Sequence, residues 1–268
     1  MIVVKVGGSE GIDTASVCAD VASIVKDGRT VVLVHGGSHE STAIGEKLGH
    51  PPRFVTSVSG HSSRSTDRQT MEVLAMVMGG RINKMLVERL QGLGVNALGL
   101  SGIDGRLLEA VRKPTLRIVE GGRRLILRGE FSGRVERVNV ALLTTLLDAG
   151  YTPIVAPFAL SAENEMVNVD GDRAAAAIGA ALGAEALVLL TNVPGLLRDV
   201  EDPASRIPIV PVADAEVALE QVAMGRMKRK VLGAAEAVRA GVGRVILADG
   251  RIARPVERAL AGEGTIVS

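Results

Sequence analysis

Two glycine pairs follow predicted strands, and the residues around them are suited to binding an anion. The first apolar run ends in Lys5-Val-Gly7-Gly8-Ser, and the second ends in His-Gly36-Gly37-Ser. Ligands of an open parallel sheet bind beyond the carboxyl ends of its strands, which is where both loops fall. Paired glycines let backbone N–H groups approach an anion, and Lys5 would point at the same anion. Tight turns with a solvated Lys5 are the alternative, and the two loops alone do not separate these possibilities.

Other common ligand-binding signatures are missing from the sequence. It contains neither a G-x-x-x-x-G-K-S/T phosphate loop nor a G-x-G-x-x-G turn after a strand. Its single cysteine, Cys18, excludes a disulfide framework and a multi-cysteine metal site. The four histidines have no companions at metal-ligand spacing, so we expect no metal held by protein ligands alone.

The elements that must position these loops alternate along the chain as in an α/β protein with a parallel sheet. Strands are predicted at 2–6, 30–34, 96–100, 153–156, 186–190 and 244–247. Helices are predicted at 14–27, 38–48, 69–91, 139–148, 172–182, 214–222 and 230–240. No linker or internal repeat interrupts this pattern, so we expect one continuous sheet shared by two lobes.

Residues 107–138 depart from the alternating pattern. Short apolar stretches there are separated by glycines, which predicts antiparallel β-hairpins inserted on the α/β core. Between residues 112 and 137, eight basic residues are opposed by three glutamates, a local net charge of +5 in a chain whose net charge is +1. Such a patch is either a solvated face or a surface that attracts an acidic partner.

The composition restricts the class of protein. Of the 268 residues, 47% are hydrophobic and 23% are charged, which is typical of a folded globular chain. Three Phe, one Tyr and no Trp leave little for bases to stack on, which disfavours a nucleic-acid partner. No apolar run approaches the ~20 residues that span a bilayer, and the N-terminus lacks the pattern of a signal peptide. We therefore expect a cytoplasmic protein that binds no membrane.

Six motifs in order resemble the amino acid kinase family, and within it the acetylglutamate kinases. They are Lys5-Val-Gly-Gly, His35-Gly-Gly, Arg64-Ser-Thr-Asp67, Asn168-Val-Asp-Gly-Asp172-Arg-Ala-Ala, Leu190-Thr-Asn-Val-Pro-Gly195 and Gly225-Arg-Met-Lys-Arg-Lys230. Each motif is weak alone, but together they span essentially the whole chain. The resemblance implies a three-layer αβα sandwich of the carbamate kinase type, with a substrate lobe at 1–180 and a nucleotide-binding lobe at 181–268.

The stretches 60–68, 96–105 and 225–230 are similar to one branch of this family. Acetylglutamate kinases carry Gly-x-Arg-Val-Thr-Asp at the first stretch, whereas Ser65 replaces the Val here. In the branch, the acceptor is L-2-aminoadipate tethered to a small acidic amino-group carrier protein, LysW, and the reaction belongs to lysine biosynthesis. The alternatives are an N-acetyl-L-glutamate kinase of arginine biosynthesis and a non-catalytic amino-acid-binding regulatory module.

The resemblance also implies a reaction in which ATP with Mg²⁺ phosphorylates a side-chain carboxylate to give an acyl phosphate. Such a transfer depends mainly on positioning and charge stabilisation. Lys5 and Lys230 would contact the transferring phosphoryl group from the two lobes, and Asp172 would hold both lysines. From the residues alone, Asp172 could instead cap the Ala-rich helix that follows it, and Lys230 could be a solvated helix start.

The same resemblance assigns four residues to the acceptor. Arg64 would bind its α-carboxylate with a bidentate fork, and Asn168 would hydrogen-bond its amide region. Gly36 and Gly37 would supply N–H groups to the acceptor carboxylate or the γ-phosphate.

Five further residues are assigned to the nucleotide. Gly7 and Gly8 would cradle the ATP phosphates, while Thr191, Asn192 and Gly195 would line the adenosine side. Many family members have Asp where this chain has Asn192. We also expect a homodimer rather than a hexameric ring.

Overall fold

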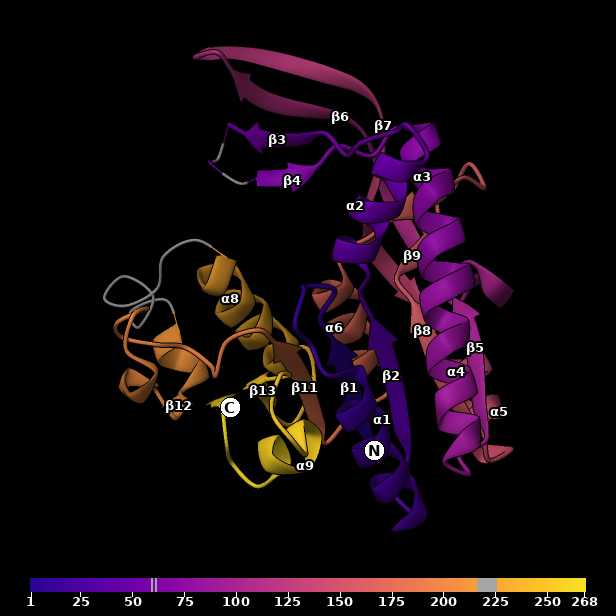
Figure 1. Cartoon of the computed structure of the whole chain (residues 1–268), viewed down its shortest axis with the longest axis vertical. Coiled ribbons are helices and arrows are strands. Elements are labelled where there is room, and N and C mark those ends of the chain that lie inside the picture. Colours follow the sequence, from indigo (N-terminus) through magenta and orange to yellow (C-terminus); the bar gives the residue numbers. More distant parts are fainter. Residues whose placement is uncertain (59, 61, 216–225) are drawn as a thin grey trace.

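The computed structural model describes residues 1–58, 60, 62–215 and 226–268. In this part of the chain, eight strands form a sheet in the order β12-β14-β13-β11-β1-β2-β8-β5 (Figure 1). Neighbouring strands are parallel except β13 and β14, which are antiparallel. The strands are β1 (Ile2–Val6), β2 (Val31–His35), β5 (Ala97–Ser101), β8 (Thr152–Ala156), β11 (Ala186–Thr191), β12 (Ile209–Val210), β13 (Val245–Asp249) and β14 (Thr265–Val267).

Helices cover both faces of this sheet, so the predicted three-layer αβα sandwich is confirmed. Strand β1 shows the reason: every residue is buried, with Val3 in the core on one face and Val4 in the core on the other. Such strands are apolar throughout because neither face meets water. One face packs against α5 (Val140–Asp148), α6 (Gly171–Ala181) and α8 (Arg226–Arg239), and the other against α1 (Thr14–Lys26), α4 (Asn83–Gly92) and α9 (Pro255–Leu260).

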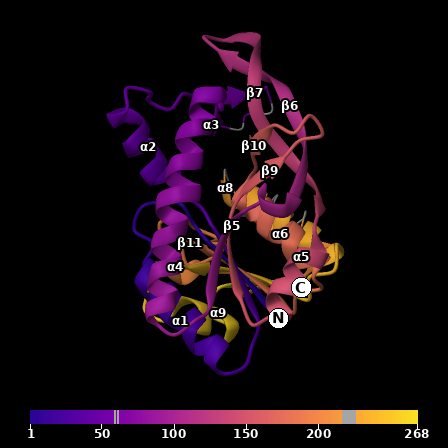
Figure 2. The ribbon, with the colours of Figure 1, turned by 90° about the vertical axis from the view of Figure 1, so that its right-hand side faces the viewer.

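A second sheet contains the predicted hairpin. Its order is β4-β3-β6-β7-β10-β9, and β6 pairs with β7 antiparallel. Figures 1 and 2 show β6 and β7 projecting at one end of the molecule, beyond the large sheet. The four strands besides this pair are only three or four residues long, too short for a clear alternating pattern, and they were not predicted. The strands are β3 (Phe54–Ser57), β4 (Ser62–Arg64), β6 (Leu108–Glu120), β7 (Arg123–Val138), β9 (Phe158–Leu160) and β10 (Met166–Asn168).

The helix predicted at 69–91 is a column of three segments, of which the middle one is not α-helical. A π-helical segment, η1 (Ala75–Ile82), separates α3 (Arg68–Leu74) from α4. The adjacent Gly79 and Gly80 lie in this segment, where the missing side chains weaken the preference for regular α geometry. The preceding helix, α2 (Ser38–Lys47), packs against the same column.

The large sheet joins the two ranges expected to form lobes. Strand β1 of the first range pairs with β11 of the second along its whole length, Ile2 with Ala186 to Val6 with Leu190. The helix predicted at 214–222 lies outside the described residues from 216 onward. Before it, 212–214 form a short 3₁₀ turn.

Candidate active site

The centre of the site is an ion cluster at the carboxyl end of β1. Lys5 shares the face of β1 that carries Val3, so its side chain points toward α6 rather than α1. Its Nζ lies 2.7 Å from Asp172 Oδ1. Lys230 of α8 donates a hydrogen bond to the other carboxylate oxygen, Oδ2. The three side chains are 10%, 20% and 23% exposed for Lys5, Asp172 and Lys230, so the cluster is shielded from bulk water.

The electrostatics of this cluster favour the ionised form of Asp172. Burial alone would raise the pKa of its carboxyl group, but the adjacent Lys5 and Lys230 outweigh burial and hold the pKa well below its usual range. The start of α6 contributes a further favourable field, because Asp172 lies in the first helical turn.

Asp172 does not cap this helix, which was the alternative role for it. Asp170 is the capping residue: its Oδ1 accepts hydrogen bonds from the backbone N–H groups of Asp172 at 2.9 Å and Arg173 at 3.0 Å. The Asp172 carboxylate is thereby left to the two lysines. Lys230 is half-buried against it and is not a solvated helix start.

The two glycine loops lie directly against each other beside this cluster. A Cβ atom on Gly8 would stand 2.3 Å from the Gly37 backbone nitrogen, and one on Gly36 would stand 2.6 Å from the Gly8 nitrogen. Only residues without a side chain permit this approach. The Gly8 carbonyl accepts hydrogen bonds from His39 N and Ser38 Oγ, both at 2.9 Å, which connects the first loop to the start of α2.

His35 supports the second loop from inside the protein. It is almost fully buried, its Nδ1 is 2.9 Å from the Gly36 carbonyl oxygen, and its Nε2 accepts from Asn83 Nδ2 at 3.1 Å. Burial is the main reason that its pKa is lowered to about 4, and the nearby Lys5 adds to the effect. A neutral imidazole therefore orients Gly36. This supporting role of His35 could not be predicted from the sequence, because Asn83, which contacts its ring, is 48 residues away.

The structure places Arg64 next to the second glycine loop. Its Nη2 donates to the Ser38 carbonyl at 3.1 Å and to Thr42 Oγ1 at 2.8 Å, both in α2. Its guanidinium carbon lies 5.3 Å from the centre of the Phe54 ring, and burial lowers its pKa. Arg64 is thus a half-buried, fixed side chain rather than a free loop arginine.

Asn168 lies at the end of β10, two residues before the capping Asp170. It is half-buried, and its position pairs with Phe158 of β9. The backbone thus brings Asn168 to the start of the same helix that carries Asp172.

The residues predicted to line the adenosine side follow β11, the neighbour of β1. Thr191 is buried, and its carbonyl accepts from Gly250 N at 2.7 Å, whereas Asn192 is exposed. Gly195 has a φ of +143° and is packed against β14, where an added Cβ would stand 2.6 Å from Thr265 Oγ1. Thr191 and Asn192 are thus at the same sheet edge as Lys5, while Gly195 faces the neighbouring strand.

No three His, Cys, Asp or Glu side chains in the part of the chain that the structure describes are grouped so that they could hold a metal ion. No helix there has both the length and the apolar character that membrane crossing requires.

The chain is similar to known proteins along most of its length. The model of the amino acid kinase family matches residues 1–249. A protein of Deinococcus radiodurans named [LysW]-aminoadipate kinase is 59% identical over 268 residues, covering 100% of this chain and 91% of that protein. A protein of Thermus thermophilus with the same name is 54% identical over 270 residues, covering 100% of this chain and 100% of that protein. The chain therefore belongs to the amino acid kinase family.

The fold is found in a solved structure as well. An N-acetylglutamate synthase from Neisseria gonorrhoeae superposes with a TM-score of 0.81 at 24% identity, over 100% of this chain and 59% of that one. The expected amino acid kinase fold is confirmed by this likeness.

Proposed function

We propose that this protein transfers the γ-phosphoryl group of ATP to the side-chain carboxylate of L-2-aminoadipate attached to the carrier protein LysW, in lysine biosynthesis. The single observation that carries the proposal is the pair of lysines held by one buried aspartate beside two glycine loops. The names of the relatives from Deinococcus and Thermus indicate the identity of the acceptor.

Lys5 and Lys230 are assigned to the phosphoryl group in flight. An oxygen of the acceptor carboxylate attacks the γ-phosphorus, the bond to the β-phosphate bridging oxygen breaks, and ADP leaves. The acceptor is already ionised at neutral pH, so no base has to remove a proton. Negative charge spreads over the phosphoryl oxygens, and two cations fixed in advance stabilise it without reorganising. Asp172 keeps both ammonium groups in place.

The remaining assignments follow the position of each residue. The backbone N–H groups of Gly7 and Gly36 donate to the Leu190 and Val6 carbonyls at 3.1 and 2.8 Å, so these two glycines shape the loops rather than bind anions themselves. The N–H group of Gly8 is assigned to the ATP phosphates, and that of Gly37 to the acceptor carboxylate or the γ-phosphate. Arg64 binds the acceptor's α-carboxylate.

Two further assignments complete this arrangement. Asn168 binds the amide that joins acceptor and carrier, and 191–195 line the adenosine. Residues 1–180 then form the acceptor lobe and residues 181–268 the nucleotide lobe.

Magnesium is assigned to the nucleotide rather than to the protein. Both carboxylate oxygens of Asp172 face lysines, so this carboxylate is not free to be a metal ligand. Mg²⁺ would therefore be held chiefly by the phosphate oxygens of ATP, where it neutralises part of their charge.

The carrier is assigned to the β6–β7 hairpin. Arg117, Arg124 and Arg128 share one face, because Arg117 is paired with Ile126 and side chains two residues apart on a strand point the same way. All three arginines are exposed, and Ile126 between them is 59% exposed. A basic face around an apolar side chain suits an acidic protein partner.

A homodimer is the proposed assembly. Met76 and Met85, on the outer helical column, are 56% and 51% exposed, which suits a contact with a second copy. Light scattering tests this: a species of about twice 27.8 kDa is expected, whereas a monomer or a hexamer contradicts it.

The deciding experiment compares acceptors. Purified protein with ATP and Mg²⁺ is given LysW-linked aminoadipate, LysW-linked glutamate or N-acetyl-L-glutamate, and acyl phosphate is trapped with hydroxylamine. We expect fastest turnover with LysW-linked aminoadipate. Fast turnover of N-acetyl-L-glutamate would instead identify an acetylglutamate kinase, and no turnover of any acceptor would favour a binding module.

A further inference from the structure

Glu130 is a buried carboxyl group on an otherwise exposed hairpin. It lies on β7 and is 2% exposed. Ser65 Oγ donates to its Oε1 at 2.5 Å, and the Thr66 backbone N–H donates to its Oε2 at 3.0 Å. No ion pair to this carboxyl group occurs among the described residues. Burying an acid among neutral donors is unfavourable, so its location calls for an explanation.

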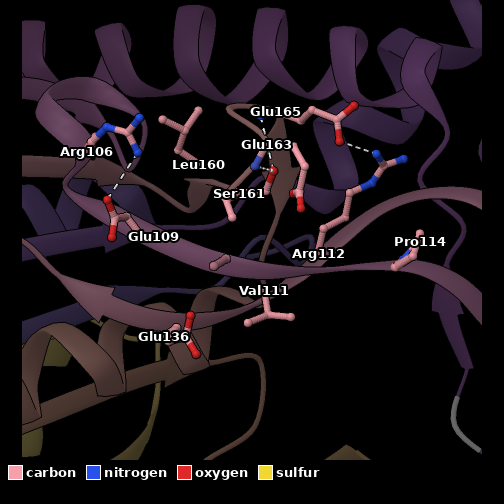
Figure 3. Close-up of a pocket in the computed structure, with 12 residues that line it drawn as sticks. Arg106, Glu109, Val111, Arg112, Pro114, Glu136, Leu160, Ser161, Glu163 and Glu165 are labelled. Atoms are coloured by element: carbon pink, nitrogen blue, oxygen red, sulfur yellow. Dashed lines mark hydrogen bonds and ion pairs between the residues drawn. The ribbon is translucent and has the colours of Figure 1, made fainter.

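Arg112, which contacts the Glu130 backbone, binds other groups with its guanidinium. Arg112 donates its Nε to the Glu130 backbone carbonyl at 2.8 Å, and its guanidinium carbon lies 3.8 Å from the centre of the Phe131 ring. The same guanidinium forms an ion pair with Glu165, as Figure 3 shows. The side chain of Glu130 is therefore left to hold the turn at residues 65–66.

That turn leads directly into the acceptor side of the site. Strand β7 holds it with a third hydrogen bond, from Phe131 N to the Thr66 carbonyl at 2.6 Å. Arg64 immediately precedes the turn and is bonded to Ser38, whose own hydroxyl donates to Gly8. A continuous chain of contacts thus runs from β7 through Arg64 to the first glycine loop.

We propose that Glu130 is a positioning residue for Arg64: by fixing residues 65–66 to β7, it aims the guanidinium at the acceptor's α-carboxylate. This inference rests on the proposed function, in which Arg64 binds the acceptor. It also means that the hairpin assigned to the carrier and the arginine assigned to the acceptor are connected through one side chain. Coupling between two such places requires a contiguous set of contacts, and these hydrogen bonds form one.

The first test separates acceptor binding from catalysis. Glu130→Gln is expected to raise the acceptor KM about tenfold, the worth of one charge-assisted hydrogen bond, and to leave the ATP KM and kcat within about twofold. Ser65→Ala, which removes one of the two donors to the Glu130 carboxyl group and keeps the Thr66 N–H, should raise the acceptor KM by a smaller factor. Glu136→Gln is the matched control, because it removes the same charge from an exposed position on the same strand.

The second test asks whether the effect passes through Arg64. In an Arg64→Ala background, Glu130→Gln and Ser65→Ala should cause no further loss, because the side chain they position is gone. Equal losses in both backgrounds, or a rise in the ATP KM matching that for the acceptor, would overturn the inference and indicate a general structural role.

A third measurement does not depend on turnover. The ¹⁵Nε resonance of Arg64, assigned by its disappearance in Arg64→Lys, should shift in Glu130→Gln and Ser65→Ala but not in Glu136→Gln. An unmoved resonance refutes the positioning role even if the kinase activity is as proposed. A shifted resonance in a protein that phosphorylates none of the acceptors would keep the positioning role and reject the proposed function.

Discussion

The Lys5–Asp172–Lys230 cluster and the β6–β7 hairpin both concentrate charge, but they do so in opposite environments. In the cluster, one carboxylate is held between two ammonium groups, and no side chain is more than 23% exposed. On the hairpin, Arg117, Arg124 and Arg128 stand in solvent. Exposed charges are screened over about 8 Å at physiological ionic strength, whereas buried ones are screened much less.

This difference predicts how each region responds to mutation. Removing Asp172 would leave two ammonium groups without a counter-charge in a poorly solvated place, which is costly, and removing either lysine would take away half of the positive charge fixed there. Removing one charge from the hairpin changes only part of a collective field. A single substitution should therefore have a large effect on activity in the cluster. On the hairpin, the effect should grow with the number of charges that are changed.

The largest effect is expected in the cluster. Lys5→Ala and Lys230→Ala should each lower kcat about 100- to 1000-fold, with a much smaller change in the ATP KM, because the proposed role of the lysines is to stabilise the transition state. Steady-state kinetics measures this, and Lys228→Ala is the control, since Lys228 is an exposed residue of the same helix. Near-normal kcat in either variant would remove that lysine from the catalytic centre.

A smaller effect concerns stability and the histidine beside Lys5. The pKa of His35 is lowered to about 4 in the folded protein, whereas that of an unfolded histidine is about 6.5. Between these values the unfolded chain binds more protons, so the unfolding free energy should fall as the pH is lowered from about 6.5 to about 4, by up to about 3 kcal/mol. Above that range His35 contributes no pH dependence.

Denaturant titrations at several pH values measure this dependence. His35→Gln cannot titrate, so the difference between its profile and the wild-type profile isolates the contribution of His35. Parallel profiles would show that His35 is not held neutral in the fold.

Arg64 should show an intermediate effect, because it is half-buried and its proposed role is to bind the acceptor's α-carboxylate. Arg64→Lys keeps the charge but loses the planar fork, so kcat/KM for the acceptor should fall about 10- to 100-fold. The control is Arg68→Lys, whose wild-type arginine is exposed and paired with Glu72. An unchanged kcat/KM would exclude Arg64 from the acceptor site.

Much of the fold could be predicted from sequence, because buried parallel strands are short apolar runs with glycine turns after them. The parts that were not predicted depend on partners distant in sequence. Strands β3 and β4 are defined by their pairing, β3 with β6 and β4 with β3. The π segment packs closely on Gly37, where an added Cβ would stand 2.6 Å from Ile82 Cδ1.

The residues of the site likewise divide into those that could be predicted from residue type and those that depend on contacts distant in sequence. Asp172 was expected to hold two lysines or to cap a helix, and its residue type is suited to both. Asp170, two residues earlier, takes the capping role, because the helix begins at Gly171 rather than after Asp172. The positioning role of Glu130 could not be predicted from the sequence, because nothing there separates it from the other two glutamates of the basic hairpin. Ser65, noted as a departure from the acetylglutamate kinase pattern, is its partner.

The smallest effects per residue are expected on the hairpin, and they should depend on which face is changed. Arg124→Glu should lower kcat/KM for the LysW-linked acceptor about two- to fivefold, since one exposed charge contributes little, and Arg124→Glu with Arg128→Glu should lower it further. Arg123→Glu is the matched control, because Arg123 lies opposite Glu120 in the β6–β7 register and therefore on the other face of the hairpin. Raising the salt concentration should abolish the difference between wild type and the double variant, since shorter screening lengths remove the attraction. Turnover of a small free acceptor should respond to neither change. Equal losses for free and LysW-linked acceptors, or for Arg123→Glu and Arg124→Glu, would mean that the basic face supports the fold rather than a partner.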